Sequence, residues 1–197
     1  MHETMNNLEH FLKVKPTGLP LRAGRILISV PFFQDPFFNR AVVLLTDYSP
    51  LSCAGLVLNK LSMNPVSEFA PDIKIEDDIY IGGPVLARNI FCIHNYSGGD
   101  KAIKLLPNIF LGYDNMLLTL IELNAVKTLR YKFFLGYSGW TPGQLEEELD
   151  NKMWIIANPT AELILDTHPE DLWYKAVAKL GPNYFHWLDM PEDISEN

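Results

Sequence analysis

Two kinds of hydrophobic pattern alternate along the chain. Residues 41–46 and 55–59 are apolar almost throughout, and residues 25–33 form a similar β-rich run. A strand with one buried face alternates apolar and polar residues, so the first two runs predict central strands covered on both faces. Further strands are predicted where β-rich runs end at turn-forming residues, over 79–81, 90–94, 109–111 and 153–157.

Apolar residues at helical spacing predict the helices. These cover residues 5–12, 65–70, 114–123, 161–165 and 168–180. Asp114 is the expected N-cap of the third helix. The last helix is expected to begin near Thr167 or His168 and to end at Gly181. Because strands and helices interleave irregularly, we expect an α+β domain with a mixed sheet and not a doubly wound sheet.

Residues 133–149 carry the clearest local pattern. An aromatic run predicts a buried strand, residues 136–140 a tight turn, and the remainder a helix. Thr141 is the expected N-cap, Pro142 the first helical residue, and Gln144 the partner that returns a hydrogen bond to the cap. Such a helix start presents backbone N–H groups at a positive helix end, which is a common way to hold an anion.

The predicted ligand site is therefore a weak site for a small anion at this helix start. Gly143 and Gln144 would donate backbone N–H groups, and Gly139 would leave the approach open. Loops from other strand ends would supply the rim, from Asn59, Gly82, Gly83 and His94. Against this site, the capping residues already occupy donors, and the three glutamates at 146–148 repel an anion. A purely structural strand-turn-helix is the alternative.

Composition fits one domain. The chain has 197 residues, of which 48% are hydrophobic and 20% charged. We expect a single domain over 1–197, with an N-terminal helix and linker at 1–20 and an acidic tail at 183–197. Cys53 and Cys92 lie in apolar runs with no second cysteine nearby, which predicts buried free thiols. Without an apolar run of about 18 residues or a signal-peptide pattern, we expect a cytoplasmic protein that does not enter the membrane.

The negative charge is concentrated at one end. Residues 1–143 hold 13 basic and 12 acidic residues, a net charge of +1, whereas residues 144–197 hold 3 and 12, a net charge of −9. An acidic face repels phosphate backbones, so direct DNA binding is not expected. The acidic region is either a solvated surface or a docking face for a protein partner.

Candidate catalytic groups are few. Ser138 lies between a predicted strand and helix, but a nucleophile elbow needs Gly-x-Ser-x-Gly and position 140 is tryptophan. The histidines are isolated, so we expect neither a metal site nor a cofactor. Gly82 and Gly83, followed by Pro84, lack the glycine and lysine spacing of nucleotide-binding loops and predict a tight turn at a strand end.

Four motifs in order resemble one family over nearly the whole chain. They are Pro31 with Asp35–Val43, residues 55–59, Gly82–Val85 with Phe91 and His94, and residues 136–149 with Trp154. The chain resembles bacterial YqgE/AlgH proteins. The resemblance implies a compact domain with a bifurcated, partly barrel-like mixed sheet surrounded by helices. It also implies a family of undetermined biochemistry, often labelled a transcriptional regulator.

The leading hypothesis is a non-enzymatic regulatory or binding protein, because no nucleophile, base and metal set is assembled. Its partner would be a protein that docks on the acidic region, or a small anionic ligand. The alternative is an enzyme acting on a phosphate ester or acyl thioester near residues 136–144, with Ser138 or His94 as the reacting group. Trp140 is expected to pack the predicted turn onto the body.

Overall fold

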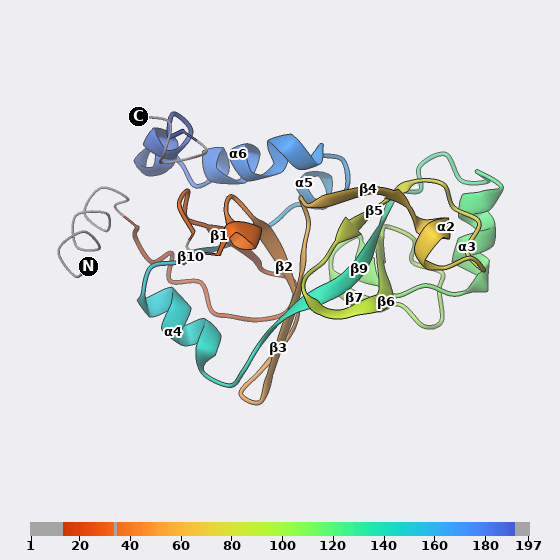
Figure 1. Ribbon diagram of the computed structural model, residues 1–197, viewed down its shortest axis with the longest axis horizontal. Coiled ribbons are helices and arrows are strands. Elements are labelled where there is room, and N and C mark those ends of the chain that lie inside the picture. The colour runs from red at the N-terminus through yellow and green to blue at the C-terminus, as the bar shows by residue number, and fades with distance from the viewer. Residues whose placement is uncertain (1–13, 34, 192–197) are drawn as a thin grey trace.

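The computed structural model describes residues 14–33 and 35–191 (Figure 1). The strands are β1 (Ile26–Ser29), β2 (Val42–Ser49), β3 (Ser52–Val57), β4 (Leu61–Pro65), β5 (Asp78–Ile81), β6 (Val85–His94), β7 (Ile103–Leu106), β8 (Ile109–Leu111), β9 (Tyr131–Trp140) and β10 (Trp154–Ala157). The helices are α2 (Val66–Phe69), α3 (Asn115–Glu122), α4 (Gln144–Asp150), α5 (Ala161–Leu165) and α6 (Pro169–Lys179), with 3-10 helices η1 (Pro36–Phe38) and η2 (Pro182–Trp187). The helix predicted over 5–12 lies outside the described residues.

The described strands form one mixed sheet that does not close on itself. Its main path runs β10-β1-β2-β3-β9-β6-β8-β7, and β4 and β5 branch from it at β9. Every pairing is antiparallel except that of β5 with β9. Helices α5 and α6 lie along one side, α4 lies near the β10 end, and α2 and α3 lie at the opposite end (Figure 1). The predicted single α+β domain with a bifurcated mixed sheet is confirmed.

Strand β9 is where the sheet divides. Its last residues, 138–140, pair with β3, residues 131–137 pair with β6, and Phe134 and Leu135 pair in parallel with β5. The predicted tight turn over residues 136–140 is therefore wrong. Gly136 has φ +66°, and the register of β9 with β6 shifts beside it, so the backbone bends there while the residues on both sides stay paired. The ten-residue strand β9 thus pairs with three neighbouring strands.

Gly82 and Gly83 pass directly over this bend. A Cβ atom on Gly82 would lie 2.3 Å from the carbonyl oxygen of Gly136, and one on Gly83 would lie 2.2 Å from the carbonyl carbon of Tyr137. The Gly82 N–H donates to the Leu135 carbonyl at 2.9 Å. Its own carbonyl accepts the Val57 N–H at 2.9 Å. Only glycine permits this approach. Together with Pro84 the two residues join β5 to β6, where the structure has a bend at Pro84 and not the predicted tight turn.

The core explains why the central strands are apolar throughout. Residues 42–45 of β2 have no exposed surface, and the same holds for Val57 at the end of β3, as predicted for strands covered on both faces. On one face of the sheet the core contains α6 residues, including Leu172 and Trp173. Leu145 of α4 belongs to a second cluster, and Leu117 of α3 belongs to a third at the far end.

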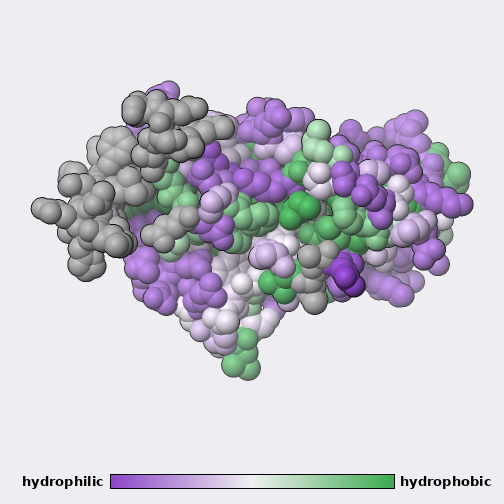
Figure 2. Space-filling view, in the orientation of Figure 1, coloured by the Kyte–Doolittle hydropathy of each residue, from purple (hydrophilic) through white to green (hydrophobic). Residues whose placement is uncertain are grey.

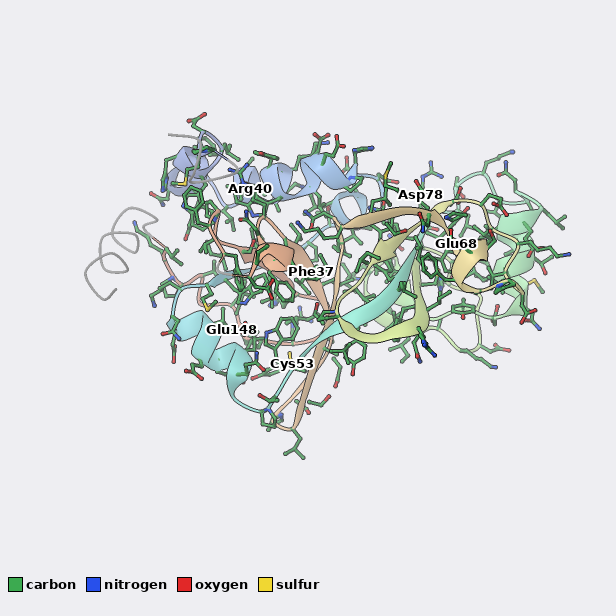
Figure 3. All side chains as sticks on the ribbon, viewed as in Figure 1. Phe37, Arg40, Cys53, Glu68, Asp78 and Glu148 are labelled. Carbon is green, nitrogen blue, oxygen red and sulfur yellow. The ribbon has the colours of Figure 1, made fainter. Side chains whose placement is uncertain are left out.

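Trp140 is a packing residue, as predicted, with 7% of its surface exposed. Its indole N–H donates to the Glu148 carboxylate at 2.9 Å. The indole N–H of Trp154 donates to the same oxygen at 2.7 Å. One carboxylate on α4 thus joins the ends of two strands, β9 and β10. The Glu148 side chain can be located in Figure 3.

Substituting Gly82 with alanine tests the backbone crossing. The φ of Gly82 is not in the left-handed region, so Gly82→Ala adds a steric clash without a change in backbone preference. We expect the free energy of unfolding to fall by about 2 kcal/mol or more, since overpacking alone costs about 1–3 kcal/mol. Gly99→Ala is the matched control, because the atoms nearest to its new Cβ belong to side chains, the closest at 3.3 Å, and not to the backbone. Equal denaturation midpoints for the two variants would contradict this account.

Removing the Trp140 ring tests the contact of the two indoles with the Glu148 carboxylate. We expect Trp140→Ala to cost about 3–5 kcal/mol, as for other buried aromatic residues. Glu148→Ala should cost about 1–3 kcal/mol, because it leaves two indole N–H groups without their acceptor. Glu147 is exposed on the same helix and serves as the control. If Glu147→Ala lowers the melting temperature as much as Glu148→Ala does, then the shared carboxylate has no special role.

Candidate functional site

The predicted rim residue Asn59 forms hydrogen bonds to two backbone groups. Its side-chain oxygen accepts the Val42 N–H at 3.0 Å, and its amide donates to the Arg40 carbonyl at 2.9 Å. It thereby ties the chain after β3 to the start of β2. Asn59 also lines a cavity, and Arg40 lines the same one, so two of the motifs behind the family resemblance meet there.

Other predicted rim residues lie inside the protein. Gly82 and Gly83 are buried beneath β9, and Ser138 donates its hydroxyl hydrogen to the Gly82 carbonyl at 3.2 Å. His94 is 1% exposed and stacks on Phe110 with 5.9 Å between ring centroids. Burial lowers the pKa of His94, which favours a neutral ring.

The predicted helix start is displaced by two residues. Helix α4 begins at Gln144, and its N-cap is Gly143 with φ +82°. The Gln144 side-chain oxygen accepts the Thr141 N–H at 3.0 Å, which is the predicted return bond to that residue. However, the Gln144 N–H already donates to the Thr141 carbonyl at 3.0 Å. Gly139 and Gly143 are exposed beside this turn. An anion site here stays a prediction, with one of its two proposed donors in use.

A larger concave site lies between α6 and the strands β4, β5 and β9. It consists of two adjoining cavities of about 310 and 460 Å³ that share Leu61, His168 and Pro169. We call it the α6 cleft. The smaller cavity is further lined by Asp77, Asp78, Tyr80, Tyr131, Lys132, Phe133 and Leu165. The larger is further lined by Pro36, Asn39, Arg40, Asn59, Lys60, Met63, Glu170, Trp173 and Tyr174.

The α6 cleft combines apolar walls with charged groups. Figure 2 shows hydrophobic residues in the middle of this face, bordered by hydrophilic residues. In Figure 3, Arg40 marks the end of the cleft beneath α6, and Asp78 marks the opposite end. Apolar walls with a few polar groups are typical of small-molecule sites in proteins.

Lys132 on β9 is the most unusual side chain of the cleft. It is only 6% exposed, and its ammonium group donates to the Thr167 carbonyl at 3.2 Å. The same group lies 5.0 Å from the centre of the Tyr80 ring. Among the described residues no carboxylate comes within 4.0 Å of it, although a buried charge is costly without such a partner. Burial lowers the pKa of Lys132 to about 8, and Asp166 partly opposes this shift.

Two more cations line the larger cavity. Arg40 is 8% exposed, donates to the carbonyls of Met190 and Pro191 at 2.6 and 2.7 Å, and lies 5.0 Å from the Trp173 ring centre. Lys60 donates to the Asn39 carbonyl at 3.0 Å. Arg40 also has φ +49°, a strained conformation of the kind that clusters at functional sites. This cavity is the more cationic half of the cleft.

The smaller cavity is acidic at its outer edge. Asp77 and Asp78 line it, and the Tyr131 hydroxyl donates to the Asp77 carboxylate. Helix α6 begins between the two cavities with Pro169, and its N-cap, His168, makes no side-chain capping bond. The first turn of α6 carries Glu170 and Asp171. An anion in the cleft would therefore be repelled by the acids of β5 and of this turn and attracted toward Lys132 and Lys60.

The serine suggested as a nucleophile and the two cysteines show no sign of activation. Ser138 is 1% exposed, and burial raises the pKa of the Cys92 thiol. Cys53, predicted to be buried, is partly exposed, yet burial of its thiol and nearby carboxylates raise its pKa to about 12. In the part of the chain that the structure describes, no group of three potential metal ligands occurs. No helix within that part is long and apolar enough to cross a membrane.

Comparisons with known proteins identify the family. A family model described as AlgH-like matches residues 26–185. A UPF0301 protein of Parabacteroides distasonis is 37% identical over 188 residues, covering 89% of this chain and 90% of the relative. A UPF0301 protein of Bacteroides thetaiotaomicron is 32% identical, with 95% and 97% covered. The chain belongs to the AlgH-like, or UPF0301, family.

Solved structures share the same architecture. The solution structure of the AlgH protein from Pseudomonas aeruginosa has a TM-score of 0.69 at 26% identity, with 90% of this chain and 98% of that chain covered. A crystal structure of a Corynebacterium diphtheriae protein has a TM-score of 0.72 at 20% identity, with 90% and 96% covered. The latter likeness concerns the fold alone.

The charge of Lys132 should appear in the pH dependence of stability. Folded Lys132 loses its proton near pH 8, whereas the unfolded chain keeps it up to about 10.5. The unfolded chain therefore binds more protons between these values, and this residue makes stability rise with pH across that window. Below pH 8 Lys132 is protonated in both the folded and the unfolded chain, so the full free-energy cost of burying its charge remains.

We expect Lys132→Met to be more stable than the parent at neutral pH. Its advantage should shrink by about 3 kcal/mol as pH rises to 10.5, corresponding to the lowered lysine pKa. Chemical denaturation of both proteins across this range measures the difference, in which all other titrating groups cancel. Parallel curves for the two proteins would mean that Lys132 titrates as an exposed lysine does.

Proposed function

We propose that this protein is a non-enzymatic binding protein that takes up a small anionic ligand in the α6 cleft. One observation carries the proposal: the buried Lys132 ammonium lines a cavity and has no described carboxylate within ion-pair distance. A bound carboxylate or phosphate would supply the missing counter-charge, and charge-assisted hydrogen bonds are among the strongest in proteins.

A binding role is favoured over an enzymatic one by the state of the reactive groups. Ser138 and His94, the residues expected to react in the alternative, are each 1% exposed. Neither lines the α6 cleft. A hydrolase of phosphate esters or thioesters would need a nucleophile and a base within hydrogen-bond reach of the same ligand atom.

The regulatory action implied by the resemblance would then pass through a protein partner in the cytoplasm. Exposed acids on α4, including Glu146, Glu147 and Asp150, offer a negative face to such a partner. A basic protein surface fits this face, whereas a phosphate backbone is repelled by it. Ligand uptake beside α6 and partner binding at α4 are separate steps of the proposal.

Titration with inorganic phosphate and with acetate tests the ligand site. Amide chemical shifts should change at Lys132 and residues 167–170, near the cleft, at millimolar anion. Lys132→Met should weaken binding about tenfold or more, since a hydrogen bond to a charged group contributes roughly 1.5–3 kcal/mol. Lys175→Met removes an exposed charge of α6, paired with Asp171 at 3.3 Å, and should leave affinity unchanged.

The location of the shifts decides between sites. Changes confined to residues 139–144 would place the ligand at the start of α4, and no change at either place would contradict the ligand proposal.

A titration with duplex DNA of mixed sequence at low salt tests direct DNA binding. Micromolar binding that weakens with salt would contradict the proposed protein partner.

A further inference from the structure

The surroundings of Lys132 fit a reactive amine as well as a cation. Its amine group lines the smaller cavity, with the Thr167 carbonyl at 3.2 Å and the face of Tyr80 at 5.0 Å. Neither neighbour requires a positive charge as a carboxylate would. A buried amine without an ion-pair partner is the setting in which lysines attack carbonyl groups.

We propose that Lys132 captures small oxo acids covalently, its side-chain nitrogen forming an imine with the carbonyl carbon of the ligand. This rests on the proposed function, because it assigns a chemical class to the anion of the α6 cleft. The ligand carries an aldehyde or ketone beside a carboxylate. Capture is reversible binding, with no turnover.

The chemistry balances without a further reactant. The lone pair of the neutral amine attacks the carbonyl carbon, and a proton passes from nitrogen to oxygen to give a carbinolamine. A carbon–nitrogen double bond then forms as the carbon–oxygen bond breaks, and the oxygen leaves as water. Hydrolysis reverses every step and releases the oxo acid unchanged. No atom is oxidised or reduced.

The charges of the cleft orient such a ligand. Asp77 and Asp78 line the same cavity as Lys132, so a carboxylate is repelled from that side. Lys60 lies in the adjoining cavity, and His168 and Pro169 at the start of α6 line both cavities. The carboxylate therefore turns toward Lys60 while the carbonyl group faces Lys132. A cavity of about 310 Å³ is at the small end of ligand sites, which fits a ligand of a few carbon atoms.

Proton affinity separates Lys132 from the exposed lysines. Burial lowers its pKa to about 8, so a larger fraction is neutral near pH 7 than for a lysine in water. The charged and titratable groups that face it from the packed elements are Asp77, Asp78, Tyr80, Tyr131, Asp166 and His168. Of these, Asp166 favours the protonated form and thereby limits the shift.

Reductive trapping tests the capture. The full chain is incubated at neutral pH with glyoxylate and cyanoborohydride, which reduces an imine to a stable carboxymethyl-lysine. Peptide mass spectrometry then gives the labelling rate at each lysine. We expect Lys132 to be labelled about tenfold faster than the exposed Lys175, because more of it is neutral and the ligand is held beside it. Faster labelling of Lys175 would overturn the proposal.

Competition with phosphate tests the capture at Lys132 without a substitution. Excess phosphate should slow labelling of Lys132 and leave that of Lys175 unchanged. In the variants, Lys132→Arg cannot form the imine, so the phosphate-sensitive part of the label should be lost from the protein. Lys175→Met should not alter labelling of Lys132.

The covalent and non-covalent proposals can fail separately. If glyoxylate alone shifts the amides near Lys132 but label spreads evenly over exposed lysines, then imine formation is wrong and anion binding stands. If glyoxylate and phosphate both leave these amides unchanged and Lys132 is unlabelled, then both proposals are wrong.

Discussion

The architecture depends on one contact between two backbones. Gly82 and Gly83 cross β9 so closely that a Cβ atom on either would overlap the main chain of residues 136–138. There the Gly82 carbonyl meets both the Val57 N–H and the Ser138 hydroxyl, while its N–H reaches Leu135. The branch of β4 and β5 from β9 follows from this crossing, and residues of all three strands line the α6 cleft. Gly82 and Gly83, which were predicted as rim residues of a ligand site, allow three strands to approach one another here.

Much of the fold was predictable because its signals are local. The apolar run of β2, the Asp114 cap of α3 and the start of α6 each depend on neighbouring residues. The predicted turn at residues 136–140 failed because Gly136 bends a strand whose partners are distant in sequence. The short strands β4 and β7 were missed for a related reason. Their mixed polar and apolar residues acquire strand character only by pairing with β5 and β8.

The candidate site was less predictable than the fold. The α6 cleft gathers segments that are far apart in sequence, and only the Asn59 motif placed one predicted rim residue there. Lys132 carried a faint signal, since it is a single charge inside an aromatic strand. Reading it as buried required knowledge of what α5 and α6 cover. The helix start at Gly143 attracted the prediction because its pattern is visible locally, whereas the cleft depends on tertiary packing.

The shared carboxylate of Glu148 has an optical consequence. The four tryptophans form two close pairs, Trp140 with Trp154 edge to face and Trp173 with Trp187 stacked, each with 6.4 Å between ring centroids. Indoles at this separation couple their electronic transitions, and the two orientations give different circular-dichroism bands. The first pair is bound to the Glu148 carboxylate on α4, and the second pair joins α6 to η2. The chromophores therefore report separately on α4 and on the α6–η2 region, without any attached label.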